Sequence, residues 1–279
     1  MKKTPIFYFL AAVIMLAGCG KNEEESNSNS DSGYTLPAEY HDMTAARHLK
    51  KIFKEDVNYD WTGHNDTVII PDSTVFVWDN DRVCSVHEYH YTVSEFDNQV
   101  FLYDEITYSC TYENDRIANI HCDETIYWND SVGNRQSDMW EWDVPFNYTG
   151  SFLTLMGGTK LYYNDSSDVI DMKFIWEGEW VSQYKNPVWQ NRNLTEITYI
   201  DLSNNTSWQH NYSYDNKISA YRCIPRELAI FFGLSNLSRN NVVEMDNYNY
   251  FSYEYDGDYP VTRTLTHANG IETTHYEYE

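Results

Sequence analysis

The chain has 279 residues and a formal net charge of −24 at neutral pH. So acidic a chain does not fit nucleic-acid binding, which needs a basic surface to neutralise phosphates. Aromatic residues make up 16% of the chain, with 25 Tyr and 9 Trp. Because aromatic side chains favour strands and are scarce in disordered segments, the composition indicates a folded, β-rich protein.

Residues 1–18 have the layout of a signal peptide. Lys2 and Lys3 precede the apolar run IFYFLAAVIML, and the next residues lead into Cys19. The run is too short for an ordinary membrane-spanning helix, which needs about 20 apolar residues. The ending Leu-Ala-Gly-Cys resembles the bacterial lipobox. This resemblance implies that the chain is cleaved before Cys19 and that Cys19 carries acyl chains such as palmitate. The alternative is a plain secreted protein whose cysteine is unmodified.

Residues 19–36 are predicted to form a flexible tether. Most of the segment reads CGKNEEESNSNSDSG, which has too little apolar surface to offset the entropy of ordering. Its start, CGKNEEE, resembles the lysine-plus-acids signal that sends lipoproteins of Bacteroidota to the cell surface. The resemblance implies an outer-membrane lipoprotein, and whether it faces the periplasm or the outside stays open.

Residues 37–279 are predicted to form a single β-rich domain that begins with a helix over 40–55. The helix is predicted from apolar residues at nearly helical spacing, which include Leu49, Ile52 and Phe53. A helical insert is predicted near 225–236, where Pro225 can begin a helix.

From about residue 65 the apolar residues alternate with period two, which indicates strands. VFVWDNDRVCSV at 75–86 matches SCTYENDRIANI at 109–120, and each reads as a strand, a polar turn and a returning strand. Looser copies are KLYYNDSSDVIDM at 160–172, NYSYDNKISAY at 211–221 and FSYEYDGDYPVTR at 251–263. Their irregular spacing predicts an antiparallel β meander with variable loops and not a strict solenoid.

Cys84 and Cys110 are predicted to be neighbours on adjacent strands if a turn closes near residue 97. A disulfide between them is compatible with an oxidising compartment, and two buried free thiols are the alternative.

Two tryptophan-rich segments offer the best candidates for chemistry. MWEWD at 139–143 and IWEGEW at 175–180 place acids among indole rings, the combination that a glycosidase cleft uses. The candidate catalytic residues are Glu141, Glu177 and Glu179, and the candidate ligand-binding residues are Trp140, Trp142, Trp176 and Trp180. The alternative is that the rings pack in the sheet while the acids face solvent.

No metal site or cofactor is predicted. The acids of DNDR at 79–82 do not follow the spacing of a calcium loop and suit a turn better. His87 and His90 are three residues apart, so on a strand they point to opposite faces and cannot easily share a metal ion.

The last 70 or so residues resemble the C-terminal half of a Bacteroidales lipoprotein family, a domain of unknown function with a porin-like antiparallel sheet. The matching residues are Tyr212, Tyr214, Asp215, Asn240, Asn241, Val242, Tyr253, Tyr255, Asp256, Gly257, Tyr259 and Pro260. With the hairpin copies, which are similar to YD repeats, the likeness spans roughly residues 65 to 279. The resemblance implies a curved antiparallel β meander of many strands, a half-barrel or porin-like sheet, and no particular activity.

These features together predict a lipid-anchored envelope or cell-surface protein that binds a glycan or a protein without catalysis. Two alternatives stay open: a hydrolase acting on a glycan, and a structural partner of an outer-membrane complex. The predicted partners are the membrane, reached through the lipid anchor, and a glycan or an envelope protein.

Overall fold

The protein is described from a computed structural model. The structure describes residues 47–59, 67–93, 99–113, 116–129, 134–149, 152–154, 160–163, 169–176, 179–267 and 270–279. The predicted signal peptide, Cys19, the tether and Glu177 lie outside the described residues.

The described residues form an antiparallel β meander, as the alternating sequence predicts. Its first strands are β1 (Leu49–Tyr59), β2 (Thr67–Asp79), β3 (Arg82–Val93), β4 (Val100–Glu113), β5 (Arg116–Asn129), β6 (Arg135–Pro145), β7 (Asn147–Thr149) and β8 (Phe152–Thr154). The chain continues through β9 (Lys160–Tyr163), β10 (Val169–Trp176), β11 (Glu179–Gln190), β12 (Asn193–Asp201), β13 (Thr206–Ile218), β14 (Asn240–Met245), β15 (Asn249–Asp256), β16 (Tyr259–His267) and β17 (Gly270–Tyr278).

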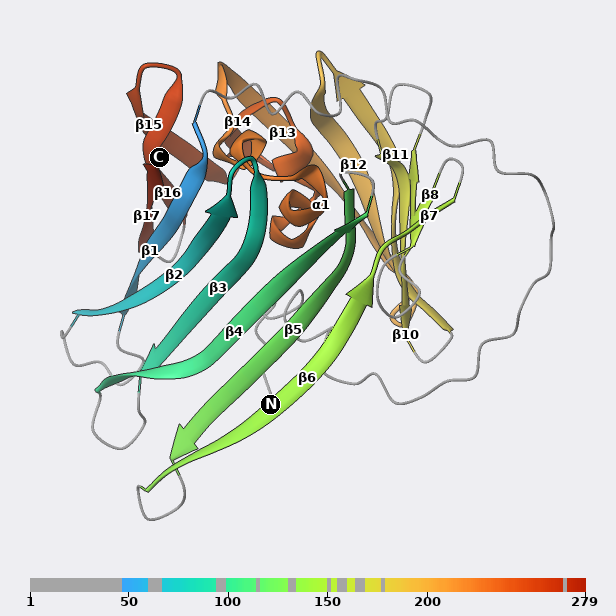
Figure 1. Cartoon of the computed structure of the whole chain (residues 1–279). Helices are drawn as coiled ribbons and strands as arrows, with labels where there is room; N and C mark the ends of the chain where they lie inside the picture. Colours follow the sequence, from blue (N-terminus) through green and yellow to red (C-terminus); the bar gives the residue numbers. More distant parts are fainter. Residues whose placement is uncertain are drawn as a thin grey trace.

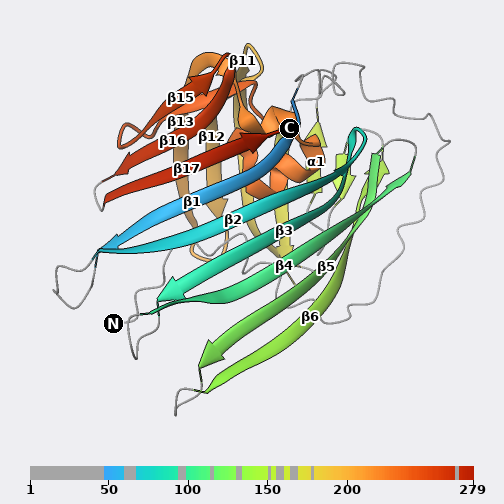
Figure 2. The same cartoon turned by 60° about the vertical axis from the view of Figure 1, so that its left-hand side comes forward.

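Strand order follows the chain, with one exception that joins its two ends. β1 pairs with β17 on one side and with β2 on the other, so the first and last strands are neighbours. Figure 2 shows β17, β1 and β2 to β6 side by side. Among the described residues, β6 pairs with β5 and β7 pairs with β8, but β6 and β7 do not pair with each other and are joined only through Phe146 of the chain. The pairing of β1 with both β2 and β17 makes one continuous curved sheet. The described residues do not close this sheet by hydrogen bonds between β6 and β7.

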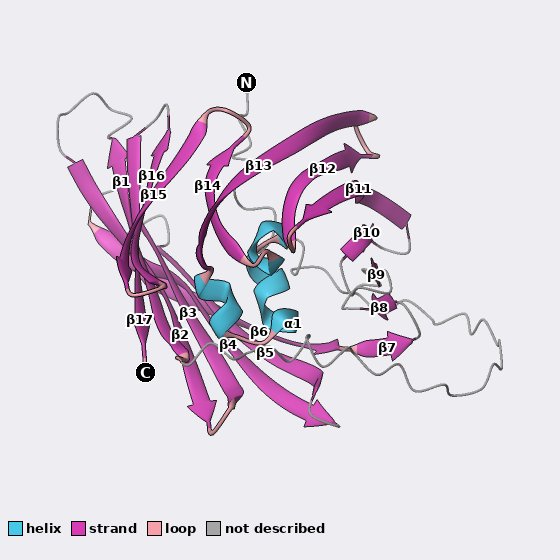
Figure 3. Ribbon diagram, turned by 90° about the horizontal axis from the view of Figure 1, so that it is seen from above, coloured by secondary structure: helices cyan, strands magenta, loops and turns pink. Residues whose placement is uncertain are grey.

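A short helical insert lies between β13 and β14, close to the predicted place. It comprises η4 (Ala220–Cys223), α1 (Arg226–Ala229), η5 (Ile230–Phe232) and η6 (Leu234–Leu237). Figures 1 and 3 show the insert inside the curve of the sheet, with β12 and β13 on one side and β3 to β5 on the other. We call the face of the sheet that packs on the insert the inner face.

The hydrophobic core lies between the inner face and the insert. Phe232 packs on Phe76 of β2 and on Tyr221, with ring centroids 6.0 and 5.4 Å apart. Fully buried side chains come from strands at both ends of the meander and from the insert. They include Leu49, Ile117, Ile120, Leu161, Leu194 and Ile224. Burial of such apolar area stabilises the curved sheet by about 25 cal/mol per Å². No helix of the described residues is long and apolar enough to cross a bilayer.

The helix predicted over 40–55 is wrong for residues 49–55, which lie in strand β1. The register of β1 with β17 shifts between Leu49 and Lys51. This bulge turns both Leu49 and Ile52 toward the core, so that an i, i+3 spacing arises on a strand. Partners on both edges supply backbone hydrogen bonds that outweigh the local helical preference.

The predicted hairpins differ in outcome. Asp79 pairs with Arg82 and Asn80 has a φ of 55°, so DNDR is the turn between β2 and β3. The copies at 109–120 and 251–263 also join paired strands. The copy at 211–221 does not, because β13 runs on to Ile218 before the chain leaves the sheet.

Candidate functional site

A polar groove of about 490 Å³ lies over the junction of β12, β13 and β14. Its lining is rich in amide and hydroxyl groups: Gln190, Asn191, Asn193, Thr195, Tyr212, Ser213, Tyr214, Asp215, Asn216, Arg239 and Asn240. We call it the amide groove. The size is within the range of small-molecule sites in proteins.

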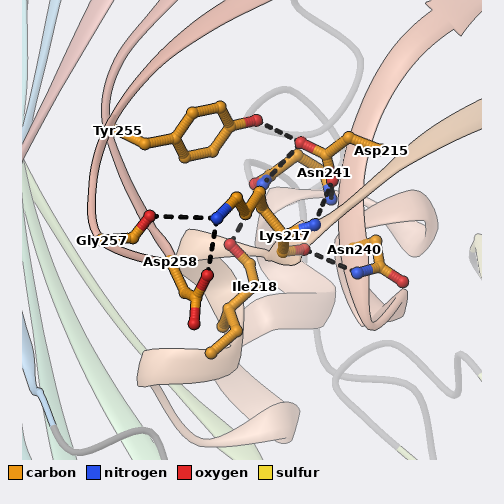
Figure 4. Close-up of polar contacts among 8 residues, drawn as sticks. All are labelled: Asp215, Lys217, Ile218, Asn240, Asn241, Tyr255, Gly257 and Asp258. Atoms are coloured by element: carbon orange, nitrogen blue, oxygen red, sulfur yellow. Dashed lines mark hydrogen bonds and ion pairs between the residues drawn. The ribbon is translucent and has the colours of Figure 1, made fainter.

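The amide groove forms where the ladder between β13 and β14 is interrupted. Their register shifts between Tyr214 and Ile218, so the intervening residues leave the regular pairing. Asp215 fills the gap, because Oδ1 accepts hydrogen bonds from the backbone N–H of Lys217 at 3.0 Å and of Asn241 at 3.1 Å. Its Oδ2 accepts from the side chains of Asn241 and Tyr255 (Figure 4). The carboxylate thus holds β13, β14 and β15 together.

Two asparagines complete the floor of the amide groove. Asn193 and Asn240 bond to each other twice, through Asn193 Nδ2 to Asn240 Oδ1 and through the Asn240 backbone N–H to Asn193 Oδ1, both at 3.0 Å. Asn240 Nδ2 also donates to the carbonyl of Lys217 at 2.7 Å (Figure 4). Lys217 Nζ in turn reaches Asp258 Oδ1 at 2.7 Å. The floor is therefore fixed before any ligand arrives.

The walls of the amide groove are exposed and chemically mixed. Gln190, Asn191, Ser213, Asn216 and Arg239 all have exposed side chains. Amides and hydroxyls both donate and accept hydrogen bonds, whereas the guanidinium only donates. Such a set suits a neutral ligand that carries many hydroxyl groups.

A second polar region lies on the inner face of β2 to β5. Asp72, Glu88, His90, Asp104 and Glu124 share this face by strand register. His90 Nδ1 lies 3.7 Å from Asp72, and its Nε2 lies 3.8 Å from Glu88. Burial lowers the pKa of His90, but the contacts with these two carboxylates outweigh it and raise the pKa to about 10. We call these five residues the inner acidic cluster.

Two acids of this cluster are almost fully buried. Asp104 is 5% exposed, and its Oδ1 has no hydrogen-bond partner within the described part of the chain. Burial raises the pKa of Asp104 to about 6, against the positive charge of His90. Glu124 is 3% exposed, and burial followed by the charge of Asp104 raises its pKa to about 7. Both carboxyls therefore exchange protons close to neutral pH.

The strand alternation separates the predicted catalytic and aromatic residues of the first segment. Trp140 and Trp142 lie on the inner face, opposite Glu124 and Cys122, while Glu141 lies on the outer face opposite Asp123. Trp142 packs against the core, whereas Trp140 is 46% exposed. Glu141 and the two rings therefore do not share one cleft.

In the second segment only the backbone is described. Trp176 pairs with Glu179, and Ile175 pairs with Trp180, across the β10–β11 hairpin. Glu177 lies outside the described residues. The structure thus places this segment at the β10–β11 hairpin, at the opposite end of β11 from the groove residue Gln190.

An exposed aromatic stack on the inner face was not predicted. Tyr199 of β12 and Trp208 of β13 are cross-strand partners, with ring centroids 5.6 Å apart and ring planes at 21°. Tyr184 of β11 continues the row, and Trp208 at its end is 48% exposed. The alternation of β13 could have shown that Trp208 shares a face with Tyr212, but not that Tyr199 would lie beside it.

The predicted proximity of Cys84 and Cys110 agrees with the register of β3 and β4. Ser85 pairs with Ser109, so the two cysteines occupy the next position of the ladder. Both are free thiols in the structure, Cys84 exposed and Cys110 half-buried. Burial raises the pKa of Cys110 to about 12. A disulfide between them stays a prediction.

Sequence reasoning found part of the amide groove and missed the rest. Asp215, Asn240 and Asn241 stand out in the family resemblance, but as pattern residues without a role. Gln190 and Arg239 carry no local signal, because they meet only where the backbone N–H of Arg239 donates to the carbonyl of Arg192, in the turn after Gln190.

No protein-family model matches the chain, and no curated protein matches it. Among solved structures, the chain is similar to a porin-like protein from Bacteroides vulgatus ATCC 8482. That similarity has a TM-score of 0.27 and 12% sequence identity, and it covers 84% of this chain and 99% of the other. The resemblance to a Bacteroidales lipoprotein family therefore stays a prediction.

Proposed function

We propose that this protein is a lipid-anchored envelope protein that binds a glycan in the amide groove without changing it chemically. The proposal depends on one observation: a groove of about 490 Å³ with a rigid floor and exposed amide, hydroxyl and guanidinium walls. Glycans present hydroxyl groups that both donate and accept, which is the pattern that Gln190, Asn191, Asn216 and Arg239 complement.

The preformed floor favours binding, because little conformational entropy is lost when the ligand arrives. Asp215 accepts hydrogen bonds from three residues, two of them in neighbouring strands, so its carboxylate is occupied by structural contacts. A glycosidase needs a pair of carboxyls free to act on the sugar, and Asp215 is the one acid among the described residues that line the groove. The arrangement supports binding over hydrolysis.

Attachment through Cys19 would hold the groove at a membrane surface, with residues 19–36 as the spacer. The net charge of −24 would keep the domain away from an anionic lipid surface. Metabolic labelling with a palmitate analogue tests the anchor: we expect label in the wild type and none in Cys19→Ser. Protease treatment of whole cells then distinguishes surface from periplasmic exposure.

A glycan array followed by calorimetry on the full chain in detergent tests the groove. We expect Gln190→Ala and Arg239→Ala each to weaken binding of the selected glycan at least tenfold. Gln209→Ala is the matched control, since Gln209 is an exposed glutamine of β13 outside the groove lining, and it should bind like the wild type. Release of a shortened glycan during the assay would contradict the non-catalytic role.

The stack of Tyr199 and Trp208 is the competing binding surface, because sugars also stack on exposed indole rings. Trp208→Ala separates the two surfaces. Loss of binding in this variant, with Arg239→Ala unaffected, would move the site from the amide groove to the inner face.

A further inference from the structure

A histidine and two carboxylates converge on the outer face of β5 and β6, away from the amide groove. The ligating atoms of His121, Asp123 and Glu141 all lie within 4.8 Å of one another. Asp123 and Glu141 are direct cross-strand partners, and His121 precedes Asp123 by two residues on the same face. The sequence hides this triad, because Glu141 joins it only through the register of the two strands.

The imidazole of His121 is oriented by residues that are not part of the triad. Its Nδ1 lies 3.1 Å from Asp143 Oδ1, and the same oxygen accepts a hydrogen bond from Asn119 Nδ2 at 2.8 Å. A carboxylate that holds the second nitrogen of a histidine is the usual outer support of a metal-bound imidazole. With the proton on Nδ1, the lone pair of Nε2 points toward the triad.

The Nε2 atom of His121 can carry either a proton or a metal ion on the side that faces the two carboxylates. Nε2 of His121 lies 3.4 Å from Asp123 Oδ1, so two electron-rich atoms face each other unless a proton or a cation lies between them. Glu141 adds a third negative oxygen from the neighbouring strand. A proton and a metal ion compete for Nε2, so binding of the ion would release a proton.

We propose that His121, Asp123 and Glu141 bind one divalent transition-metal ion of the zinc class, with Asp143 as a positioning residue. One imidazole and two carboxylates suit zinc or manganese better than calcium, which prefers six to eight oxygens. The side chains of His121 and Asp123 are 42% and 44% exposed, so the ion would keep positions open for water or an external ligand. Figure 2 shows β5 and β6 at one margin of the row of strands β1 to β6.

Calorimetric titration of the metal-free, tag-free full chain with zinc chloride tests the proposal. We expect one ion per chain, and at least tenfold weaker binding in His121→Ala and in Glu141→Gln. His87→Ala is the matched control, because His87 lies on the outer face of β3 and contacts Ser85 and Thr107 instead of the triad. Circular dichroism establishes that each variant is folded.

Asp143→Asn tests the positioning role. It should weaken zinc about 10- to 100-fold and shift the pH dependence of binding, because the imidazole loses the carboxylate that orients it. A wild type that binds no zinc, a His121→Ala variant that binds as tightly as the wild type, or equal affinity for calcium would each overturn the proposal.

Discussion

Asp104 and Glu124 lie on the inner faces of neighbouring strands β4 and β5, and the charge of Asp104 raises the pKa of Glu124. The two carboxyls are 5% and 3% exposed. They belong to the inner acidic cluster, whose one basic group is His90. The sheet therefore carries two buried carboxyls whose pKa values lie near neutral pH, beside a histidine that stays protonated there.

The stability of the protein should fall as pH rises from about 5 to about 8. The folded-state pKa of Asp104 is about 6 against an ordinary 3.8, and that of Glu124 is about 7 against 4.5. The folded state therefore binds more protons than the unfolded state in this window, so that raising the pH destabilises it. Urea denaturation at several pH values measures the slope.

Neutral replacements should remove this pH dependence. Asp104→Asn and Glu124→Gln should each raise the free energy of unfolding at pH 8 by about 1–3 kcal/mol and flatten the slope. Glu113→Gln, at an exposed strand end, is the control and should leave the slope unchanged. An unaltered slope in both test variants would show that these carboxyls do not titrate as described.

Replacement of His90 should destabilise the protein at neutral pH. Its folded-state pKa of about 10 lies above the ordinary 6.5, so its contribution is present below pH 6.5 and is lost as pH rises through 10. His90→Gln leaves Asp72 and Glu88 without a positive neighbour. Because the ring is about one third exposed, the loss should be about 1–2 kcal/mol. A double-mutant cycle with Glu88→Gln should show a coupling that vanishes above pH 10.

The hydrogen bonds of Asp215 should contribute more to the free energy of unfolding than a nearby surface ion pair does. Asp215→Ala leaves the N–H groups of Lys217 and Asn241 and the Tyr255 hydroxyl without their acceptor, at an expected cost of about 2–4 kcal/mol. Asp258→Ala removes only a 65% exposed partner of Lys217 and should cost less than about 1 kcal/mol. Chemical denaturation compares the two, and equal losses would contradict the structural role of Asp215.

Thiol labelling should divide the cysteines by burial. Cys84 is exposed and should react with a maleimide in the folded, reduced protein, whereas Cys122 and Cys223 are 0% and 1% exposed and should react only after unfolding. Burial raises the pKa of Cys223 to about 12, which further slows its reaction. Non-reducing peptide mapping of the untreated protein then decides between two free thiols and a disulfide that links Cys84 to Cys110.

Local sequence patterns predicted the strands and most of their turns. Alternation with period two is a property of each strand by itself, and Asn80 or Gly257 marks a turn through its own backbone conformation. The helical insert was also visible, because Pro225 and the following apolar residues are contiguous. These features need no knowledge of distant partners.

Other features depend on partners that are distant in the chain. The strand β1 was mistaken for a helix because its bulge at Leu49 to Lys51 arises only when it pairs with β17. The separation of Trp140 from Glu141 follows from strand alternation, yet the neighbour of each is set by the register with β5. Bulges shift register by one residue, and the sequence carries little local signal for them.

The sequence alone determined a β meander with polar turns, an acidic surface and an N-terminus that predicts a lipid anchor. Only the tertiary structure decided that Gln190 and Arg239 share a groove, and that His121 meets Glu141 on the outer face. The physical reason is the same in both cases. Strand pairing brings together side chains from different strands, and the energy that selects the register comes from the buried inner face and not from the residues of the site.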